Sequence, residues 1–443
     1  MQLSTTVPFA IALSSLTAVV GCDLSTTTAS TAEHATHDDQ GSVVASTKQR
    51  LLSYTIAPTH VEAAVRGNTD FAIDLYRQLA ANPGNFFFSP FSVSESLAMT
   101  WAGARGETED QMAKTLHFDL PQSQLHSTFN AIDRAITHYG QDAEGAPHEG
   151  FHLTLVNALW GQQGYPFTAP FLDILAQDYG AGVRVVDFVG SPEGARATIN
   201  SWMAERTGGR IEELLSPGSI TRATRLVLGD AVHFSAAWKT PFEPASTRFA
   251  RFTRRDGSII EVPTMTATQN LNYGEGRDAE GRDYAAVQLP YEGGELSMVL
   301  LLPSAGGLDA FEASLTTERL AAIVETLELR SVALTLPCFK IESSIDLHDA
   351  LARLGMPLAF TDAADFSGIN GRGGLSLSTV VHQAFVDVDE AGTEAAAATT
   401  VGFTTTAAHL PAEVHFERPY LFLIRDSATG TILFLGRVDD PSL

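Results

Sequence analysis

The sequence predicts an α+β fold, with helices gathered early in the chain and strands gathered late. Two patterns lead to this prediction. Apolar residues recur at helical spacing over residues 70–80 and 91–102, whereas strand-like segments make up most of the last 70 residues. The regular alternation of strands and helices that a parallel α/β sheet requires is missing from the pattern. A hydrophobic fraction of 44%, with 25 Phe in 443 residues, supplies a sizeable core and excludes a disordered chain.

Charge and cysteine content exclude several classes of function. Asp and Glu number 52 against 28 Lys and Arg, so the formal net charge is −24. This balance disfavours nucleic-acid binding, which needs clustered Lys and Arg, and it disfavours a polybasic membrane anchor. Two cysteines exclude a disulfide scaffold, and Cys338, in an apolar strand-like run, is expected to be buried and inert. We therefore expect no nucleic-acid partner.

The chain begins with an apolar run over residues 7–20. This run is shorter than the roughly 20 residues that a bilayer span needs, so residues 1–21 are predicted to be a signal peptide. Val19-Val20-Gly21-Cys22 resembles a bacterial lipobox, in which the cysteine is lipidated and becomes the mature N-terminus. The alternative is an ordinary signal peptide with an incidental Cys22. The protein is thus expected to be exported, as a cell-envelope lipoprotein or as an extracellular protein, with membrane contact only through the lipid.

Residues 22–56 are predicted to be a flexible tether, because Thr, Ser, Ala, His and Asp occur there with almost no periodicity. His34, His37 and Asp38 read as polar linker residues, since nothing there fixes the geometry of a metal site. No metal site is therefore predicted. From residue 57 to residue 443 no linker-like composition and no repeat divides the chain, so one domain is expected.

Within this domain the predicted elements follow in order. Residues 70–80 and 91–102 are predicted helices, and the second is preceded by Ser89 as the cap and Pro90 in the first turn. A third helix, over residues 345–354, stops at Gly355. Strands are predicted over residues 185–188, 225–234, 284–289, 296–302, 332–339, 375–389, 413–424 and 431–438.

The segment from residue 390 to residue 408 has the features of a loop and of a strand. From 395 to 408 it carries no charge and no side chain larger than Val except Phe403, and strand-like core sequence follows it. It is therefore an exposed excursion within one domain. At a period of two, one face carries Thr393, Ala395, Ala397, Thr399, Val401 and Phe403, and the other face stays small or polar. This pattern is typical of a half-buried strand, and Gly392 would supply hinge freedom. A segment with two packings can store free energy and release it on a trigger.

The sequence EAGTEAAAAT at residues 390–399 resembles the reactive-loop hinge of inhibitory serpins. NFFFSPFSV at residues 85–93 resembles the segment that leads into the central helix of that family. The resemblance covers about residues 60–440, in order. Further matches lie at residues 97–99, 158–160, 199–202, 207–211, 262–265, 288–291, 354–367 and 416–424, the last departing from the commonest family signature at Glu417 and Tyr420.

This resemblance implies the serpin fold, with three β-sheets, eight or nine helices and an exposed reactive loop. It implies an inhibitor of serine proteases and not an enzyme. A protease attacks the loop and forms an acyl-enzyme, and the cleaved loop then inserts into the main sheet and drags the protease across the molecule. No cofactor is implied, and a monomer is expected. The hinge residues would be Glu390, Gly392, Thr393, Ala395, Ala396, Ala397, Ala398 and Thr399.

The family's scissile bond follows seventeen loop residues counted from the hinge glutamate, which gives Thr406–Ala407. Counting back from Glu413 and Val414 gives Ala408–His409 instead, because this loop is about two residues longer than in a common family member. The candidates Thr406, Ala407 and Ala408 are all small. They predict target proteases with a small or apolar primary pocket, of the elastase-like or subtilisin-like kind.

Ser89, Ser92 and His382 match the family's shutter, a polar cluster under the main sheet that gates its opening. Trp238 matches the tryptophan at the point where the loop first enters. The usual shutter asparagine is Asp230 here. One hypothesis is an Asp230–His382 contact whose strength varies with pH, since histidine titrates near neutrality. The alternative is that Asp230 bonds a backbone or hydroxyl group while His382 stays neutral.

Two other functions compete with inhibition. A non-inhibitory serpin that acts as a carrier or cell-surface binding protein usually has charged, bulky or Pro residues in the hinge, and residues 395–398 contain none. A hydrolase would need a motif such as G-x-S-x-G or H-E-x-x-H, and the sequence has neither. The sequence therefore favours the inhibitor.

Overall fold

The computed structural model describes residues 41–53, 55–139, 151–393 and 410–442. Within these residues it has ten α-helices and two short 3-10 helices, and the expected α+β class is confirmed. The helices are α1 (Pro58–Ala80), α2 (Pro90–Trp101), α3 (Gly106–Thr115), α4 (Gln122–His138), α5 (Ala169–Tyr179), α6 (Pro192–Arg206), α7 (Leu308–Ser314), α8 (Thr317–Glu325), α9 (His348–Leu354), α10 (Ser367–Asn370), η1 (Pro244–Ser246) and η2 (Pro357–Phe360).

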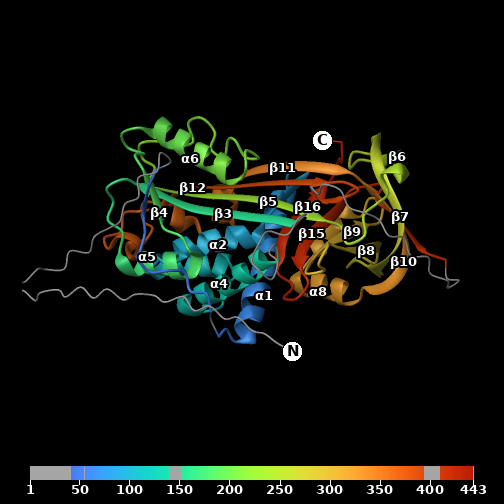
Figure 1. Cartoon of the computed structure of the whole chain (residues 1–443), viewed down its shortest axis with the longest axis horizontal. Coiled ribbons are helices and arrows are strands. Elements are labelled where there is room, and N and C mark those ends of the chain that lie inside the picture. The colour runs from blue at the N-terminus through green and yellow to red at the C-terminus, as the bar shows by residue number, and fades with distance from the viewer. Residues whose placement is uncertain (1–40, 54, 140–150, 394–409, 443) are drawn as a thin grey trace, which may run out of the picture. The chain divides into compact units, whose positions relative to one another are not determined.

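The first sheet has seven strands in the order β1-β4-β3-β5-β13-β12-β11. In Figure 1, α6 covers one face of this sheet, and α2 and α4 lie on the other face. At its centre β5 and β12 run parallel and pair directly over most of their length. The strands are β1 (Ser42–Val44), β4 (Val183–Val186), β3 (Phe151–Gln162), β5 (Leu226–Ala237), β13 (Gly392–Thr393), β12 (Leu377–Val388) and β11 (Phe339–Asp346).

The second sheet has nine strands, in the order β14-β10-β7-β8-β9-β15-β16-β2 with β6 paired to β7. The 19-residue β7 pairs with β6, β10 and β8 along its length, so two of the three expected sheets form one hydrogen-bonded unit. Its strands are β14 (Ala412–His415), β10 (Glu328–Pro337), β7 (Ile259–Arg277), β8 (Asp283–Pro290), β9 (Leu296–Pro303), β15 (Tyr420–Asp426), β16 (Ile432–Val438), β2 (Phe86–Phe88) and β6 (Arg248–Thr253).

The central helix α2 begins as the sequence predicts. Ser89 is its cap, and the Ser89 hydroxyl accepts a hydrogen bond from the Ser92 amide at 3.2 Å. Every residue of α2 is buried, including Glu95, Ser94 and Ser96. A helix buried on all sides cannot turn a polar face to water, so its polar residues must find partners inside the protein.

The predicted tether is wrong for residues 42–53, which pack on the domain. Strand β1 pairs antiparallel with β4 at the edge of the first sheet. Ser46 donates to Asp173 at 2.6 Å, and the Arg50 guanidinium lies 2.5 Å from Asp133 and 2.8 Å from Asn130. Three paired residues are too few to produce a visible alternation, and the anchoring side chains lie more than 70 residues away.

Other predicted boundaries also differ. The helix predicted over residues 70–80 is the second half of α1, which begins at Pro58. The strand predicted over residues 332–339 is two strands, since β10 ends at Pro337 and β11 begins at Phe339. The helix predicted from residue 345 begins at His348, because β11 runs on to Asp346. The strand predicted over residues 413–424 is likewise divided, and Pro419 directly precedes β15. Proline has no N–H to donate to a ladder, which explains breaks beside Pro337 and Pro419.

Cys338 lies at the break between β10 and β11. It is half-buried rather than fully buried, which corrects the expectation from the apolar run around it. Burial raises the pKa of its thiol to about 12, and the nearby carboxylates of Glu390 and Asp389 add to this shift. The thiol is therefore protonated at neutral pH, as expected for an unreactive cysteine.

The N-terminal predictions concern residues outside the described part of the chain. The signal peptide (residues 1–21) and the lipidation candidate Cys22 lie there. Among the helices of the described residues, none combines the length and apolar character needed to cross a bilayer.

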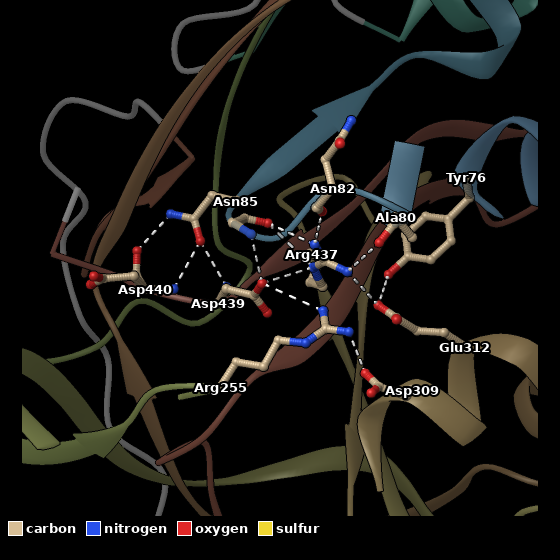
Figure 2. Close-up of polar contacts among 11 residues, drawn as sticks. Tyr76, Ala80, Asn82, Asn85, Arg255, Asp309, Glu312, Arg437, Asp439 and Asp440 are labelled. Atoms are coloured by element: carbon tan, nitrogen blue, oxygen red, sulfur yellow. Dashed lines mark hydrogen bonds and ion pairs between the residues drawn. The ribbon is translucent and has the colours of Figure 1, made fainter. Parts of the chain in front are cut away.

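A buried arginine ties the last strand to the rest of the domain (Figure 2). Arg437 of β16 is fully buried and forms ion pairs with Glu312 at 3.1 Å and Asp439 at 3.2 Å. It also donates to the backbone carbonyls of Asn82 at 2.8 Å and Gly84 at 3.0 Å, just after α1. Residues from three parts of the chain thus meet at one guanidinium, which only a planar, five-donor side chain can satisfy.

We expect Arg437→Met to lower the free energy of unfolding of the native form by about 3–5 kcal/mol, because it leaves Glu312 as an uncompensated buried charge. The denaturation midpoint in urea measures this loss. Arg277→Met is the matched control, since its ion pair with Asp283 is exposed and should contribute less than about 1 kcal/mol. Equal midpoints for the two variants would contradict the assigned role of Arg437.

Candidate functional site

The first residues of the candidate hinge already lie inside the first sheet. In β13, Gly392 pairs with Ala237 and Thr393 pairs with Ala236, both on β5. Thr393 also pairs with Val388 of β12. Further along, β5 and β12 pair with each other, from Phe385–His233 to Leu377–Leu226. Gly392 and Thr393 therefore separate β5 from β12 at one end of the sheet. Over the rest of their common edge, which we call the β5–β12 seam, the two strands bond each other directly.

Gly392 is needed because of close packing. A Cβ atom at this position would lie 2.2 Å from the carbonyl oxygen of Ala236, closer than any two such atoms approach. Its φ is not positive, so conformational freedom is not the reason for glycine in this state. Any other residue at position 392 would push β13 away from β5.

An aromatic pair lies beside the inserted hinge residue. The buried Thr393 hydroxyl lies 2.7 Å from the Tyr291 hydroxyl, and Tyr291 stacks on Trp238 with ring centroids 4.7 Å apart. The Trp238 indole N–H donates to the carbonyl of Asp389 at 3.0 Å. Burial raises the pKa of Tyr291 well above its ordinary value, so the phenol keeps its proton. Trp238 therefore stands at the entry point of the loop.

A tight turn connects β12 to β13. The Asp389 carboxylate accepts hydrogen bonds from the amides of Ala391 at 2.8 Å and Gly392 at 3.1 Å, the geometry of an Asx turn. Burial raises the pKa of Asp389, although these two bonds lower it. On the outer side of the turn, Glu390 accepts from the Thr247 hydroxyl at 2.5 Å. These contacts hold the start of the loop in one orientation.

The predicted shutter residues meet deeper along the same seam. Asp230 of β5 and His382 of β12 are register partners, and the Asp230 Oδ2 atom lies 3.1 Å from the His382 Nδ1 atom. The Ser89 amide donates to His382 Nε2 at 3.0 Å. Because Nε2 accepts this bond, a neutral ring carries its proton on Nδ1, but neither Nδ1 nor Asp230 Oδ2 completes a hydrogen bond at this contact. The contact between Asp230 and His382 is thus present, and its proposed pH dependence stays a prediction.

The polar cluster extends beyond the residues that the sequence singled out. The Ser92 hydroxyl lies 2.7 Å from Asp230 Oδ1 and 2.8 Å from Asn157 Oδ1, and Asn157 Nδ2 donates to Glu95 at 2.9 Å. Asn157 of β3 is the register partner of Asp230. A row of Asn157, Asp230 and His382 therefore crosses three adjacent strands at one level, and Glu95 of α2 continues it below the sheet.

Burial raises the pKa of Glu95 well above its ordinary value, and the negative charge of Asp133 raises it further. Arg50 opposes this shift, and Asp230 adds a smaller positive contribution. A neutral Glu95 would also satisfy the hydrogen bonds of this network. The Ser92 hydroxyl has one proton, but it lies beside two acceptor oxygens, of Asp230 and Asn157. If the Asn157 amide is rotated, its oxygen accepts the proton of the Glu95 carboxylic acid and its N–H donates to the Ser92 hydroxyl, which is then free to donate to Asp230.

Several residues of this site were not predicted. Asn157 and Tyr291 adjoin or belong to segments with family resemblance, at residues 158–160 and 288–291, and that proximity was the only signal for them. Glu95 gave no signal, because a glutamate in a helix is usually at the surface. Other predicted residues lie outside the described part of the chain: the hinge residues Ala395, Ala396, Ala397, Ala398 and Thr399 and the reactive-bond candidates Thr406, Ala407 and Ala408.

Residues 66–441 match the family model described as "Serpin (serine protease inhibitor)". The chain is a serpin. It is 41% identical over 392 residues to the leukocyte elastase inhibitor of Bos taurus, a match that covers 86% of this serpin and all of the relative.

Solved serpin structures agree with this assignment. The native state of tengpin, a thermophilic serpin, matches with a TM-score of 0.77 and 30% identity over 89% of this chain and 97% of the other. Uncleaved ovalbumin matches with a TM-score of 0.78 and 27% identity over 86% of this chain and 100% of the other. The whole domain, and not only the hinge segment, therefore follows the family.

We expect Glu95→Gln to raise the stability of this serpin at pH 8 and to have less effect near pH 5. The folded protein holds the Glu95 proton more tightly than the unfolded chain, so the free energy of unfolding falls as pH rises from about 4.5 through the folded-state pKa. Glutamine keeps the uncharged shape and removes this loss. Thermal midpoints over a pH series would measure the effect.

Glu328→Gln serves as its control, because the Glu328 side chain is 73% exposed. This variant should leave the pH profile of the midpoint unchanged. If Glu95→Gln also leaves the pH profile of the midpoint unchanged, the prediction that ionisation of Glu95 lowers the stability of the folded protein is wrong.

Proposed function

We propose that this serpin inhibits serine proteases as a suicide substrate, through insertion of residues 394–403 between β5 and β12. The observation that carries the proposal is β13, in which Thr393 lies between β5 and β12 and pairs with both. The protease serine would form an ester with the carbonyl carbon of Thr406, and the peptide bond to Ala407 would break. The Ala407 amine would take the proton that the protease base removed from the serine. Insertion of the freed strand would then distort the protease before water releases the ester.

The register of β13 supports this proposal. Thr393 is paired with Ala236 on one side and with Val388 on the other. Continuing both pairings by six residues brings Thr399 opposite Asp230 on β5 and opposite His382 on β12. Those two residues are already register partners of each other, so both edges lead to the same alignment. A strand can therefore enter the seam without any slip of β5 against β12.

Side-chain size supports the same register. Thr393 faces the core, where it meets Tyr291, so Ala395, Ala397 and Thr399 would share this inward face. All are small enough to enter a packed interior without creating a clash. About ten inserted residues with backbone bonds worth roughly 1 kcal/mol each would contribute on the order of 10 kcal/mol. That is comparable to the whole stability of a typical domain and is enough to distort a catalytic site.

The targets follow from the small residues at the candidate reactive bond. Thr406, Ala407 and Ala408 suit a shallow apolar primary pocket of the elastase-like or subtilisin-like kind. Several relatives carry the name leukocyte elastase inhibitor, which supports the first of these two classes. The protein would act as a monomer, after export, and Cys22 would hold it at the cell envelope if lipidated.

A covalent complex tests the proposal. We expect an elastase or a subtilisin to form a complex with residues 41–443 that survives boiling in detergent, while a trypsin-type enzyme should form less, because small residues leave its acidic pocket unpaired. The cleaved serpin should also melt at a higher temperature than the intact serpin, since its first sheet gains a strand. Cleavage with no complex and no rise in melting temperature would exclude the trapping mechanism.

Thr393→Arg should turn the inhibitor into a substrate. Thr393 is fully buried, and an arginine there would have to bring its charge under the sheet. The ratio of inhibitor consumed to protease trapped should therefore rise at least about tenfold, since a penalty of 1.4 kcal/mol already gives this factor. Thr393→Val, which has the same shape without the hydroxyl, should keep most of the inhibition. Full inhibition by the arginine variant would contradict insertion in this register.

The proposed pH dependence of the Asp230–His382 contact needs its own test. Insertion must separate this pair, so the energy of the pair is part of the barrier to opening. If Asp230 offsets the bond from the Ser89 amide that protonation of His382 would break, the rate of inhibition should vary with pH near neutrality. Asp230→Asn should then flatten this profile, because it removes the charge that favours protonated His382. Identical profiles for the two proteins would remove the hypothesis.

A further inference from the structure

We propose that the outer face of the β6–β7 hairpin is a second contact surface for the target protease, separate from the reactive loop. This outer face consists of six exposed side chains on one side of the hairpin: Phe249, Arg251, Thr253, Ile259, Glu261 and Pro263. The inference rests on the proposed function, because the protease reaches this surface while it holds the loop. The outer face would thus help to determine which protease this serpin binds, in addition to the residues at the reactive bond.

The composition of β6 differs from that of the chain as a whole. The protein carries a net charge of −24, yet four of its 28 basic residues fall within residues 248–255. Two of them have ion-pair partners within the domain. Arg254 pairs with Asp440 at 2.5 Å, and Arg255 pairs with Asp309 of α7 and with Asp439 (Figure 2). Arg248 and Arg251 are exposed, and neither forms an ion pair with a carboxylate among the described residues. Arg251 is thus the one basic side chain of the outer face, and Glu261 is its one acidic side chain.

Apolar side chains accompany this positive charge. Phe249 is 72% exposed and Ile259 is 51% exposed, whereas Phe252 and Val262, on the opposite side of the hairpin, are buried. Phe249 lies opposite Pro263 in the β6–β7 register, and Arg251 lies opposite Glu261. The core-facing side of the hairpin is therefore apolar for packing, but the exposure of a phenylalanine on the outer face has no explanation in the fold. Large apolar side chains exposed beside charged ones are typical of interaction sites.

The position of β6 relative to the loop identifies the occupant. Thr247, the residue before β6, donates to Glu390, the first of the hinge residues. Thr253, the last residue of β6, donates its amide to the carbonyl of Glu417, just after β14. Strand β6 is therefore fastened to both ends of the segment that presents the reactive bond. We infer that a protease bound to this segment would lie next to β6.

The chemistry of the surface sets the kind of protease. A protease with an apolar patch and acidic side chains beside its substrate cleft would pair with Phe249 and Arg251. The net charge of −24 would repel an acidic protease at long range, so a local basic contact would contribute most after the encounter. Such a contact would raise the association rate for some proteases over others that have the same kind of primary pocket.

Docking can be measured apart from trapping. An elastase-type protease whose nucleophilic serine is replaced by alanine would be titrated with the wild type and with Phe249→Ala/Arg251→Ala. We expect the dissociation constant of the double variant to be about five- to tenfold higher, and added salt to narrow the difference. With active elastase the association rate constant should fall by a similar factor, while the stoichiometry of inhibition should stay unchanged because the hinge is intact.

Leu52→Ala/Arg222→Ala is the matched control, since it also removes one exposed apolar side chain and one exposed arginine. Leu52 is 69% exposed, and Arg222 precedes the end of β5 that is far from β13. Its dissociation constant should equal that of the wild type. An unchanged constant for the β6 double variant, or an equal change in the control, would overturn the proposal. Loss of trapping with normal docking would instead count against the proposed function.

Two competing roles for the outer face would give different results in the same experiment. An edge strand is often charged to prevent aggregation, in which case the β6 variant would aggregate while its monomer docks normally. A self-association surface would make the wild type dimeric in size-exclusion chromatography and the β6 variant monomeric. Either result would overturn the assignment of this surface to the protease.

Discussion

The seam between β5 and β12 is the constraint on which the rest of the structure depends. Each strand has one edge facing the seam, and that edge can bond the other strand or a strand inserted between them. The two strands bond each other over most of their length, while β13 separates them at one end. An inserted strand would use both edges and add its own donors and acceptors. The closed seam therefore holds fewer backbone hydrogen bonds than the fold allows.

The row of Asn157, Asp230 and His382 crosses this closed seam, so its polar contacts contribute to the free energy of opening it. Buried polar groups interact strongly in a low-dielectric interior, but they are costly when a partner is missing. In this row one hydroxyl proton of Ser92 faces two acceptors, and the carboxyl groups of Asp230 and Glu95 lie within one network. Because burial raises the pKa of Glu95, the free energy of unfolding depends on whether this carboxyl group holds its proton. Opening the seam cuts the row between Asp230 and His382, at the position that Thr399 would occupy.

The sequence predicted the elements whose signal is local and missed those whose position depends on distant residues. The alternation in β12 and the Ser89-Pro90 start of α2 were visible, because period and capping are properties of neighbouring residues. The pairing of β1 was not, since three residues carry no period. The pairing of Asp230 with His382 spans about 150 residues and was suggested only through family resemblance. Glu95 was missed because burial of α2 on all sides is set by the tertiary fold.

The segment after β13 runs from the first sheet to the second, and in the proposed mechanism this connection is the reason that cleavage must come before insertion. The hinge belongs to the first sheet through β13, whereas the segment after the loop belongs to the second sheet through β14, which pairs with β10. While the chain is intact, full insertion of the loop would have to pull β14 away from β10. In the proposed mechanism cleavage would remove that single covalent link, while β15, β16 and the Arg437 ion pairs would keep the C-terminal segment in place. The free energy of inserting the loop would then become available only when a protease breaks this connection.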